Sequence, residues 1–264
     1  RGGCSPNAHG GIAALLPENV TDNFDIYFKD TMLSGGFLNN QILVTTLIKE
    51  SGKYIKEVEK FGSLFDRDDT GKYYYLRGFG GHSVKRSVCC GDETGHELMN
   101  GLKREVLRRD ITVLNEIMST SLLVNDGAVI GATSLNITNG EFYVFRAKSV
   151  ILATAGFTRC WPSAAWRQIG DGHWMALKAG AELVDVEFLQ YHPTHAWWPY
   201  GFRGSISESA RSEGGILRNV LGERFMEKYS PKRKELSTRD FVSLCMLKEI
   251  SEGRGTPQKG IYLD

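Results

Sequence analysis

The sequence predicts an α/β fold with α+β elements, because helical and strand-like patterns follow one another along the chain. Apolar residues recur at helical spacing over residues 22–61 and 94–108, whereas residues 111–146 alternate or run apolar between turn signals. The run 149–156 is apolar and ends in small residues, which suits a buried parallel strand whose carboxyl end meets a ligand.

The helices are expected in a simple order. The pair Gly35-Gly36 divides residues 22–61 into two helices, and Thr94 can cap a third over residues 94–108. A short fourth helix is expected over residues 172–180.

The strands between these helices are expected to form hairpins. Turn signals of the Asp-Gly and Asn-Gly type end at Gly127 and Gly140, and such turns favour tight antiparallel connections. The strand-like segments are residues 111–114, 121–124, 128–135 and 141–146.

A change of amino-acid composition near Leu189 indicates a second domain. From there the chain is rich in loops and in aromatic residues, namely Trp197, Trp198, Tyr200 and Phe202. We therefore expect one domain over residues 1–187 and another over residues 188–264.

Composition excludes several classes of function. The 264 residues carry 32 Lys and Arg against 31 Asp and Glu, without basic clusters, so no nucleic acid partner is expected. No apolar run approaches the roughly 20 residues that span a bilayer, so no direct membrane insertion is expected. Five cysteines without CxxC spacing indicate reduced thiols and no metal site.

Both ends of the sequence are abrupt. A glycine-rich stretch without an initiator Met leads directly into an apolar segment, and a strand-like run stops at Asp264. We expect the chain to be an internal fragment.

Four stretches carry residues suited to chemistry. Gly10-Gly11 precedes an apolar segment and would let backbone N–H groups approach an anion, although alone such a pair is usually a turn. Residues 151–156, followed by Asp171 between glycines, could hold a planar cofactor and its hydroxyls.

The other two stretches lie further along. His192 is followed by Pro193 and Thr194, and an imidazole beside a hydroxyl can bind a carboxylate, although a lone histidine is more often structural. Glu208 and Arg211 are three residues apart and could pair on one helical turn. Residues 237–240 read as a helix start that contains Arg239.

The order of these motifs resembles a known family. Ala-x-Gly-Gly-Ile-Ala-Ala, Gly-Gly-His-Ser, Thr-Gly-His-Glu-Leu, Ala-Thr-Ala-Gly, Gly-Asp-Gly, His-Pro-Thr, Glu-x-x-Arg-x-Glu-Gly-Gly, Gly-Glu-Arg-Phe-Met and Arg-Asp follow one another. Each motif is weak alone, but the ordered set resembles the flavoprotein subunit of succinate dehydrogenase and fumarate reductase, whose relative is L-aspartate oxidase.

The resemblance implies a fold and a cofactor. Residues 1–187 would be part of a Rossmann-like FAD-binding domain with a hairpin-rich portion, and residues 188–264 part of an α+β capping domain. The family's GxGxxG unit is absent from this sequence, and so are a second histidine and a second arginine that bind substrate. The implied cofactor-binding residues are Ser5, Ala8, Gly10, Gly11, Ser119, Ala153, Thr154, Gly156 and Asp171.

It also implies a reaction. Succinate and fumarate would be interconverted by hydride transfer at FAD, with Arg239 as the proton donor and with Glu208 and Arg211 as its relay. The implied substrate-binding residues are Phe79, Gly80, His192, Thr194 and Ser207.

Some features separate the chain from parts of the family. Respiratory members attach FAD through a histidine shortly before the Gly-Gly pair, where this chain has Ser5 or Cys4, so non-covalent FAD is expected, with a cysteinyl link at Cys4 as the alternative. Aspartate oxidases usually carry a glutamate where this chain has Phe79, which favours a dicarboxylate over an amino acid.

Alternatives and partners complete the expectation. An L-aspartate oxidase activity is one alternative, and a non-catalytic folded fragment that binds no cofactor by itself is another. The implied partners are a small dicarboxylate, membrane anchor subunits and an iron–sulfur subunit. The expected location is the cytoplasm, or the cytoplasmic face of a membrane through those subunits.

Overall fold

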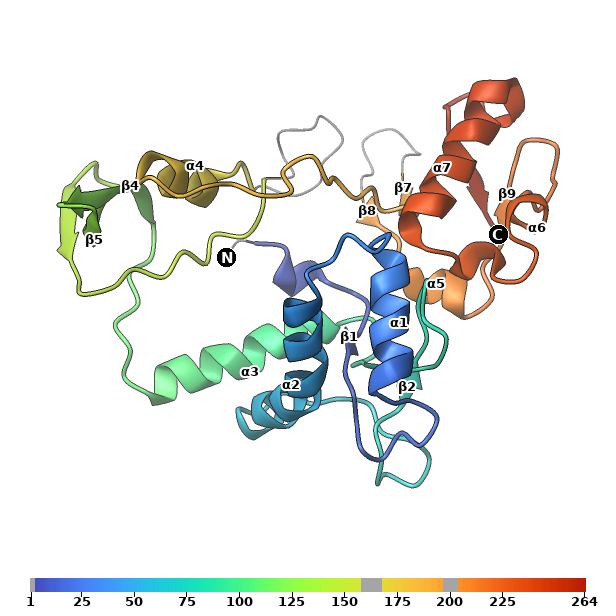
Figure 1. Cartoon of the computed structure of the whole chain (residues 1–264), viewed down its shortest axis with the longest axis horizontal. Coiled ribbons are helices and arrows are strands. Elements are labelled where there is room, and N and C mark those ends of the chain that lie inside the picture. Colours follow the sequence, from blue (N-terminus) through green and yellow to red (C-terminus); the bar gives the residue numbers. More distant parts are fainter. Residues whose placement is uncertain (1–2, 158–167, 197–203) are drawn as a thin grey trace. The chain divides into compact units, whose positions relative to one another are not determined.

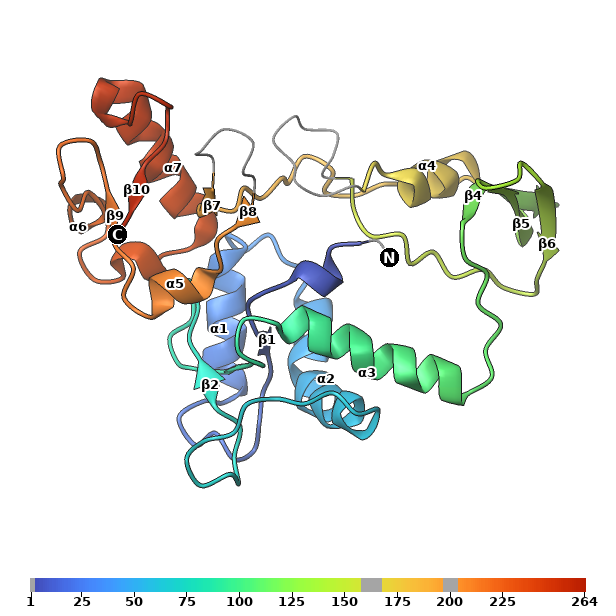
Figure 2. The ribbon, with the colours of Figure 1, turned by 180° about the vertical axis from the view of Figure 1, so that it is seen from behind.

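The computed structural model describes residues 3–157, 168–196 and 204–264 (Figures 1 and 2). It divides into two compact units, one formed by Arg1–Cys4 with Arg108–Leu189 and the other by Ser5–Leu107 with Gln190–Asp264. The division at 189/190 lies close to the expected boundary at 187/188, but the second unit also includes residues 5–107. The functional assignment of the two expected domains stays a prediction.

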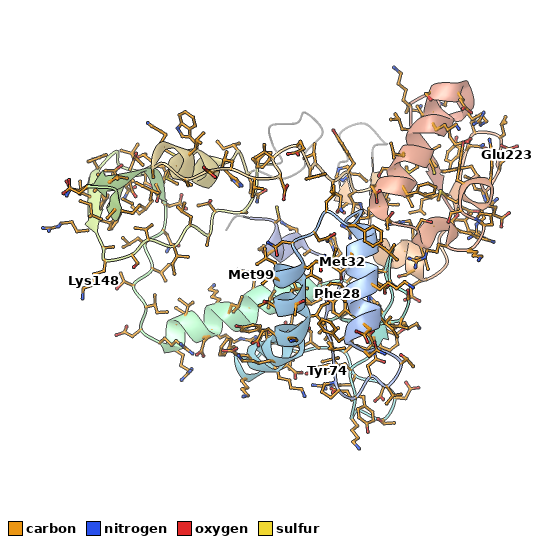
Figure 3. The ribbon with its side chains drawn as sticks, in the orientation of Figure 1. Phe28, Met32, Tyr74, Met99, Lys148 and Glu223 are labelled. Carbon is orange, nitrogen blue, oxygen red and sulfur yellow. The ribbon has the colours of Figure 1, made fainter. Side chains whose placement is uncertain are left out.

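Two of the predicted helices form a layer in the second unit. Helix α1 (Phe24–Ser34) begins after Asn23, and α2 (Gln41–Lys60) begins after Asn40; each asparagine side chain accepts backbone N–H groups of the first turn. The two helices contact each other, and Figure 3 shows Phe28 and Met32 of α1 on the side near α2. The break at Gly35-Gly36 is confirmed.

A small sheet lies beside these helices. Strands β1 (Ile12–Ala13) and β2 (Leu76–Arg77) both pair antiparallel with β3 (Ser87–Val88). Their apolar residues share a core with Ile55 of α2. A 3₁₀ turn, η1 (Ser5–Asn7), precedes β1.

Helix α3 (Thr94–Arg108) confirms the third predicted helix, but Thr94 acts differently from the expectation. It is already helical, and its hydroxyl accepts a hydrogen bond from the N–H of Cys90, in the turn before the helix. Thr94 therefore fixes the approach to the helix rather than capping its first turn.

The carboxyl-terminal part of the second unit has its own core around α7 (Arg239–Glu249), built from Leu217, Phe225, Met226, Val242 and Cys245. The other elements are β7 (His195–Ala196), β8 (Gly204–Ser205), α5 (Glu208–Ser212), β9 (Leu217–Arg218), α6 (Met226–Tyr229), η3 (Lys234–Leu236), η4 (Ile250–Arg254) and β10 (Tyr262–Leu263). Strand β7 pairs with β8, and β9 pairs with β10.

A buried carboxylate ties these elements together. Glu249 is 1% exposed and accepts hydrogen bonds from Asn219, Tyr229 and Arg254. The hydrogen bond from Arg254 lowers the pKa of Glu249 to about 2, against the opposing effect of burial. The carboxylate is thus ionised and fully paired.

The first unit contains the predicted hairpins. Strands β4 (Ile117–Asn125), β5 (Ala128–Asn136) and β6 (Phe142–Arg146) form an antiparallel sheet in sequence order. Asp126 and Gly127 both have positive φ, as a tight two-residue turn requires. Helix α4 (Asp171–Lys178) confirms the short fourth helix.

Two predicted strands are wrong. Residues 111–114 and 149–156 form no strand, and in the second run Ile151 is 89% exposed. A strand needs a neighbour to accept its ladder hydrogen bonds, and the described residues place none beside either run. The mixed fold class is confirmed, but every pairing between named strands is antiparallel.

Two further observations concern the sequence predictions. Cys4, Cys89, Cys90 and Cys245 are free thiols, while Cys160 and the aromatic residues at 197, 198, 200 and 202 lie outside the described residues. Among the helices of the described chain, none has the length and apolar character needed to cross a membrane.

Candidate active site

A cavity of about 280 Å³ lies within the second unit. Backbone of Gly10, Gly11 and Gly80 forms part of its lining, and Glu208 and Arg239 contribute charge. The cavity thus brings together residues that are far apart in sequence and that were predicted to serve cofactor, substrate and catalysis.

Glu208 connects the groups around this cavity. It is the first residue of α5, which Ser207 caps through its hydroxyl, and it is 3% exposed. Its Oε1 accepts the N–H of Gly80 at 2.6 Å, and its Oε2 lies 2.7 Å from Nε and 2.6 Å from Nη2 of Arg239. Burial would raise the pKa of Glu208, but the guanidinium groups of Arg239 and Arg211 bring it below its usual value.

Arg239 is the first residue of α7, and its side chain is 38% exposed at the cavity. Besides the contact with Glu208, its Nη1 donates to Oε1 of Gln190 at 3.1 Å. The guanidinium is therefore held from two sides while it remains open to a ligand.

Arg211 lies behind Glu208 and is 2% exposed. Its Nη1 donates to the backbone carbonyl of Glu235 at 2.7 Å, and its Nη2 lies 3.6 Å from Oε1 of Glu208. Burial lowers the pKa of Arg211 from its usual value, against the opposing effect of Glu208. The structure thus arranges Arg239, Glu208 and Arg211 as a row.

His192, Thr194 and Ser207 are not part of the described cavity lining. The Nδ1 of His192 lies 3.0 Å from the carbonyl of Thr194, and the hydroxyl of Thr194 donates to the carbonyl of Ile206. Burial, with Arg239 and Arg211 nearby, lowers the pKa of His192 to about 4. His192 is therefore neutral near pH 7, and a role in binding substrate stays a prediction.

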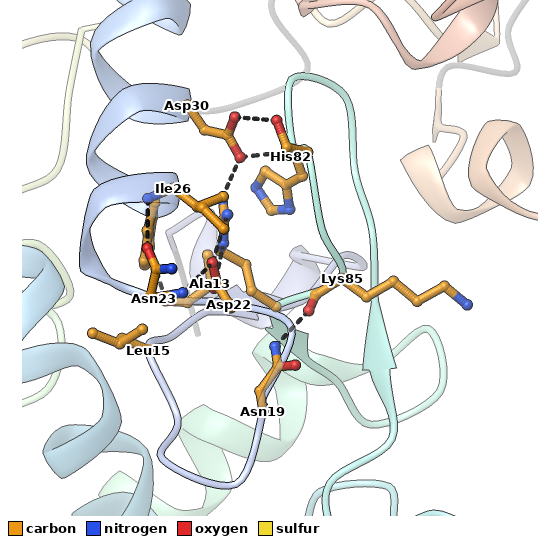
Figure 4. Close-up of polar contacts among 12 residues, drawn as sticks. Ala13, Leu15, Asn19, Asp22, Asn23, Ile26, Asp30, His82 and Lys85 are labelled. Atoms are coloured by element: carbon orange, nitrogen blue, oxygen red, sulfur yellow. Dashed lines mark hydrogen bonds and ion pairs between the residues drawn. The ribbon is translucent and has the colours of Figure 1, made fainter.

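The loop that carries Phe79 and Gly80 is fixed by a buried ion cluster (Figure 4). Arg86 is fully buried and pairs with Asp22 and Asp30, each at 2.8 Å. Asp30 also accepts the N–H and the hydroxyl of Ser83, and these bonds keep its pKa low although burial acts in the opposite direction.

Seven residues of the cavity lining were not predicted as site residues, namely Ala13, Ser34, His82, Ser87, Gln190, Thr238 and Asp240. His82 and Gln190 both line the cavity. His82 stands within the Gly-Gly-His-Ser motif, and Gln190 stands two residues before His192. The sequence signal for these two residues was their position within or next to a motif. Only the folded chain shows that they line the cavity.

The predicted cofactor residues are distributed over both units. Ser5, Ala8, Gly10 and Gly11 belong to the second unit, while Ser119, Ala153, Thr154, Gly156 and Asp171 belong to the first. Their joint role stays a prediction.

The local geometry at Gly10 leaves space for a flat cofactor. A Cβ added at Gly10 would meet only the ring of Phe79, at 3.7 Å, so this wall is bare backbone that a planar ring can approach. In the first unit, a Cβ at Gly172 would lie 1.8 Å from the hydroxyl of Thr154, so segment 153–156 lies directly against the start of α4. Ser119 shares a hydrogen bond with Ser134.

Comparison with known proteins extends this picture. The family model described as "FAD binding domain" matches residues 1–264. A fumarate reductase (CoM/CoB) subunit of Methanothermobacter marburgensis is 46% identical over 100% of this chain and 49% of its own length. The mitochondrial succinate dehydrogenase flavoprotein subunit of rice is 39% identical, over 97% of this chain and 42% of its own length.

Solved structures agree. The FrdA chain of an E. coli quinol fumarate reductase variant superposes with a TM-score of 0.89 at 31% identity, covering 98% of this chain and 46% of that one. Sdh1 of Mycobacterium smegmatis gives a TM-score of 0.78 at 35% identity, with 98% and 46% coverage. The chain spans about half the length of the curated relatives that it matches.

Proposed function

The chain belongs to the FAD binding domain family, among the flavoprotein subunits of fumarate reductase and succinate dehydrogenase, and on this premise we propose that its cavity binds the dicarboxylate that FAD reduces or oxidises. FAD is the family's cofactor, and the relatives are FAD-dependent oxidoreductases. The row of Arg239, Glu208 and Arg211 at the cavity is the observation that carries the proposal.

When bound in its reduced form, FAD would supply a hydride to one alkene carbon of fumarate, and the other carbon would need a proton. Arg239 would make that transfer, and its position in the cavity lining supports this role. As an ionised carboxylate, Glu208 would first take a proton from Arg211 and then pass it to Arg239, and water would return a proton to Arg211. Oxidation of succinate would use the same groups in reverse.

The charges around Glu208 explain why an arginine could serve as an acid. A guanidinium holds its proton tightly in water, so its loss must be brief and promptly reversed. The carboxylate of Glu208 accepts a hydrogen bond from Nε and forms an ion pair with Nη2 of Arg239, so the path for the returning proton is short. A positive group at the cavity also stabilises charge that develops on the substrate carboxylate.

Replacement of Arg239 by lysine tests this role. In the FAD-loaded protein we expect Arg239→Lys to retain FAD and to reduce fumarate about 100-fold more slowly or worse, because lysine lacks the planar fork that Glu208 and Gln190 hold. Arg218→Lys is the matched control, since Arg218 pairs with Asp264 and does not line the cavity.

Retained fumarate reduction in Arg239→Lys would show that the proton donor is elsewhere.

A comparison of turnover with succinate and with aspartate separates the candidate substrates. Aspartate-dependent peroxide production at a rate comparable to succinate turnover would replace the dicarboxylate assignment by the amino-acid one. Phe79 at the cavity, which has no charge to offer an ammonium group, favours the dicarboxylate.

Partners and location follow from the relatives rather than from the cavity. Several relatives are named as flavoprotein subunits, which supports an assembly with other subunits. We propose that these are membrane anchor subunits and an iron–sulfur subunit, as the family resemblance implies. In that assembly the chain would work at the cytoplasmic face of the membrane. Non-covalent FAD is proposed because neither Ser5 nor Cys4 can form the family's histidyl link.

A further inference from the structure

His82 lines the same cavity as Arg239 and has no part in the proposed proton row. It stands at the end of a tight turn in which its own N–H donates to the carbonyl of Phe79 at 3.0 Å. Gly81 in this turn has φ +87°, a conformation that favours glycine, so the turn has the form of type II. The sequence therefore fixes the direction in which His82 leaves the loop.

The loop around His82 is held on both sides. Before it, the N–H of Gly80 donates to Glu208 and that of Gly81 donates to the carbonyl of Leu236. After it, Ser83 donates twice to the buried carboxylate of Asp30, and Figure 4 shows His82 beside this contact. Its backbone position is thus set before any ligand arrives.

The two ring nitrogens of His82 have different surroundings. The N–H of Phe79 points to Nδ1 at 3.5 Å, and the Phe79 ring packs edge-on against the imidazole. Within the described residues Nε2 makes no hydrogen bond. It is not one of the buried, unpaired side-chain nitrogens, so it is accessible to solvent. Because Nδ1 faces a donor, the ring proton belongs on Nε2.

The charge of the ring is also defined. Burial and the nearby guanidinium of Arg86 lower the pKa of His82, against the opposing effect of Asp30 and Glu208. The imidazole is therefore neutral at pH 7 and offers one directional donor without adding a positive charge.

We propose that His82 donates a hydrogen bond from Nε2 to a carboxylate oxygen of the substrate bound in this cavity. The proposal rests on the proposed function, because it concerns the substrate of the same site. Arg239 supplies charge, while His82 supplies a fixed neutral donor on the loop of Phe79 and Gly80. No proton transfer is assigned to His82.

The test is a split between KM and kcat in the FAD-loaded protein. We expect His82→Leu to raise KM for fumarate about 10- to 100-fold, since a hydrogen bond to a charged group is lost, while kcat stays within about threefold. His82→Gln keeps an N–H donor on a side chain of similar reach, so its KM should lie near that of the unaltered protein. His96→Leu is the control, because exposed His96 of α3 does not line the cavity.

Binding of fumarate to the oxidised protein, followed by flavin absorbance, gives a second measurement that is independent of turnover. An unchanged KM and affinity in His82→Leu would overturn the proposal while the proposed function stands. A loss of kcat equal in His82→Leu and His82→Gln would also overturn it, since it would assign His82 to the chemical step. Absence of fumarate turnover in the unaltered protein would instead refute the proposed function.

Discussion

At the scale of single residues, the site combines charged groups that keep their charge with histidines that stay neutral. Glu208 keeps a carboxylate beside two guanidinium groups, whereas His192 and His82 both have lowered pKa values. An exposed histidine changes charge near pH 6.5, and the pKa of each of these two histidines lies below that value. The positive charge facing a substrate should therefore come from arginine alone.

This arrangement predicts how substrate binding responds to pH. With the pKa of His192 at about 4, the ring is neutral throughout the range in which an ordinary histidine would lose its proton. We expect His192 to gain no charge between about pH 8 and 5.5, so protonation of His192 should not tighten the binding of fumarate to the oxidised protein over that range. Flavin absorbance titrations at fixed ionic strength would measure this.

A tightening of about tenfold or more on going down to pH 5.5 would show a histidine with an ordinary pKa in the site. His192→Asn would identify it: the tightening should vanish in this variant if His192 is the group and persist if it is not. His96→Leu serves again as the control for a histidine outside the cavity.

At the scale of elements, the turn between β2 and β3 packs closely against two other parts of the site. A Cβ at Gly80 would lie 2.6 Å from the carbonyl oxygen of Ser237 and 2.8 Å from Oε1 of Glu208. Ser237 belongs to the backbone just before α7, and Glu208 is the central residue of the proposed proton relay. A methyl group cannot fit without moving one of them.

We therefore expect Gly80→Ala to lower fumarate turnover by about 10- to 100-fold, since a small displacement of catalytic groups has effects of that size. Gly78→Ala is the matched control, because a Cβ there would meet only Lys85, at 3.5 Å. Initial rates and thermal unfolding of both variants would be compared. Equal activity in the two would show that the turn yields and that its close packing is not needed for catalysis.

The elements also show what local sequence can predict. The hairpins of β4 to β6 were predicted because Asp126-Gly127 and Asn139-Gly140 specify their own turns. Segment 149–156 was assigned to a strand from its apolar character, but a strand depends on neighbours that local sequence does not contain. Gln190 and His82 likewise show their relevance only when the fold brings them to Arg239.

At the scale of the whole molecule, the two units differ in how much core they contain. Among the described residues, all three apolar cores belong to the unit of Ser5–Leu107 with Gln190–Asp264. In the described part of the other unit, Met175 is the one buried hydrophobic residue, while Ile151 and Val184 are 89% and 81% exposed. Less buried apolar area should mean lower local stability.

Hydrogen exchange should reveal this difference. Peptides covering residues 149–156 and 183–188 are expected to exchange within seconds, whereas the interior of α2 and of the β4–β5 ladder should be protected. Strong protection of residues 149–156 would contradict the exposed, unpaired state. If Ala153, Thr154 and Gly156 hold FAD as predicted, adding FAD should slow exchange there and leave α2 unchanged.

The interleaving of the two units has a consequence for synthesis on the ribosome. The cavity is lined by residues from Gly10 to Ser87 and again from Gln190 to Asp240. Roughly 100 residues must be translated between these two groups, which takes about 5 to 20 s at ordinary elongation rates. During this interval the glycine wall and the loop of His82 exist without Glu208 and Arg239. The nascent chain therefore displays half of a binding site before the half that supplies its charge has been made.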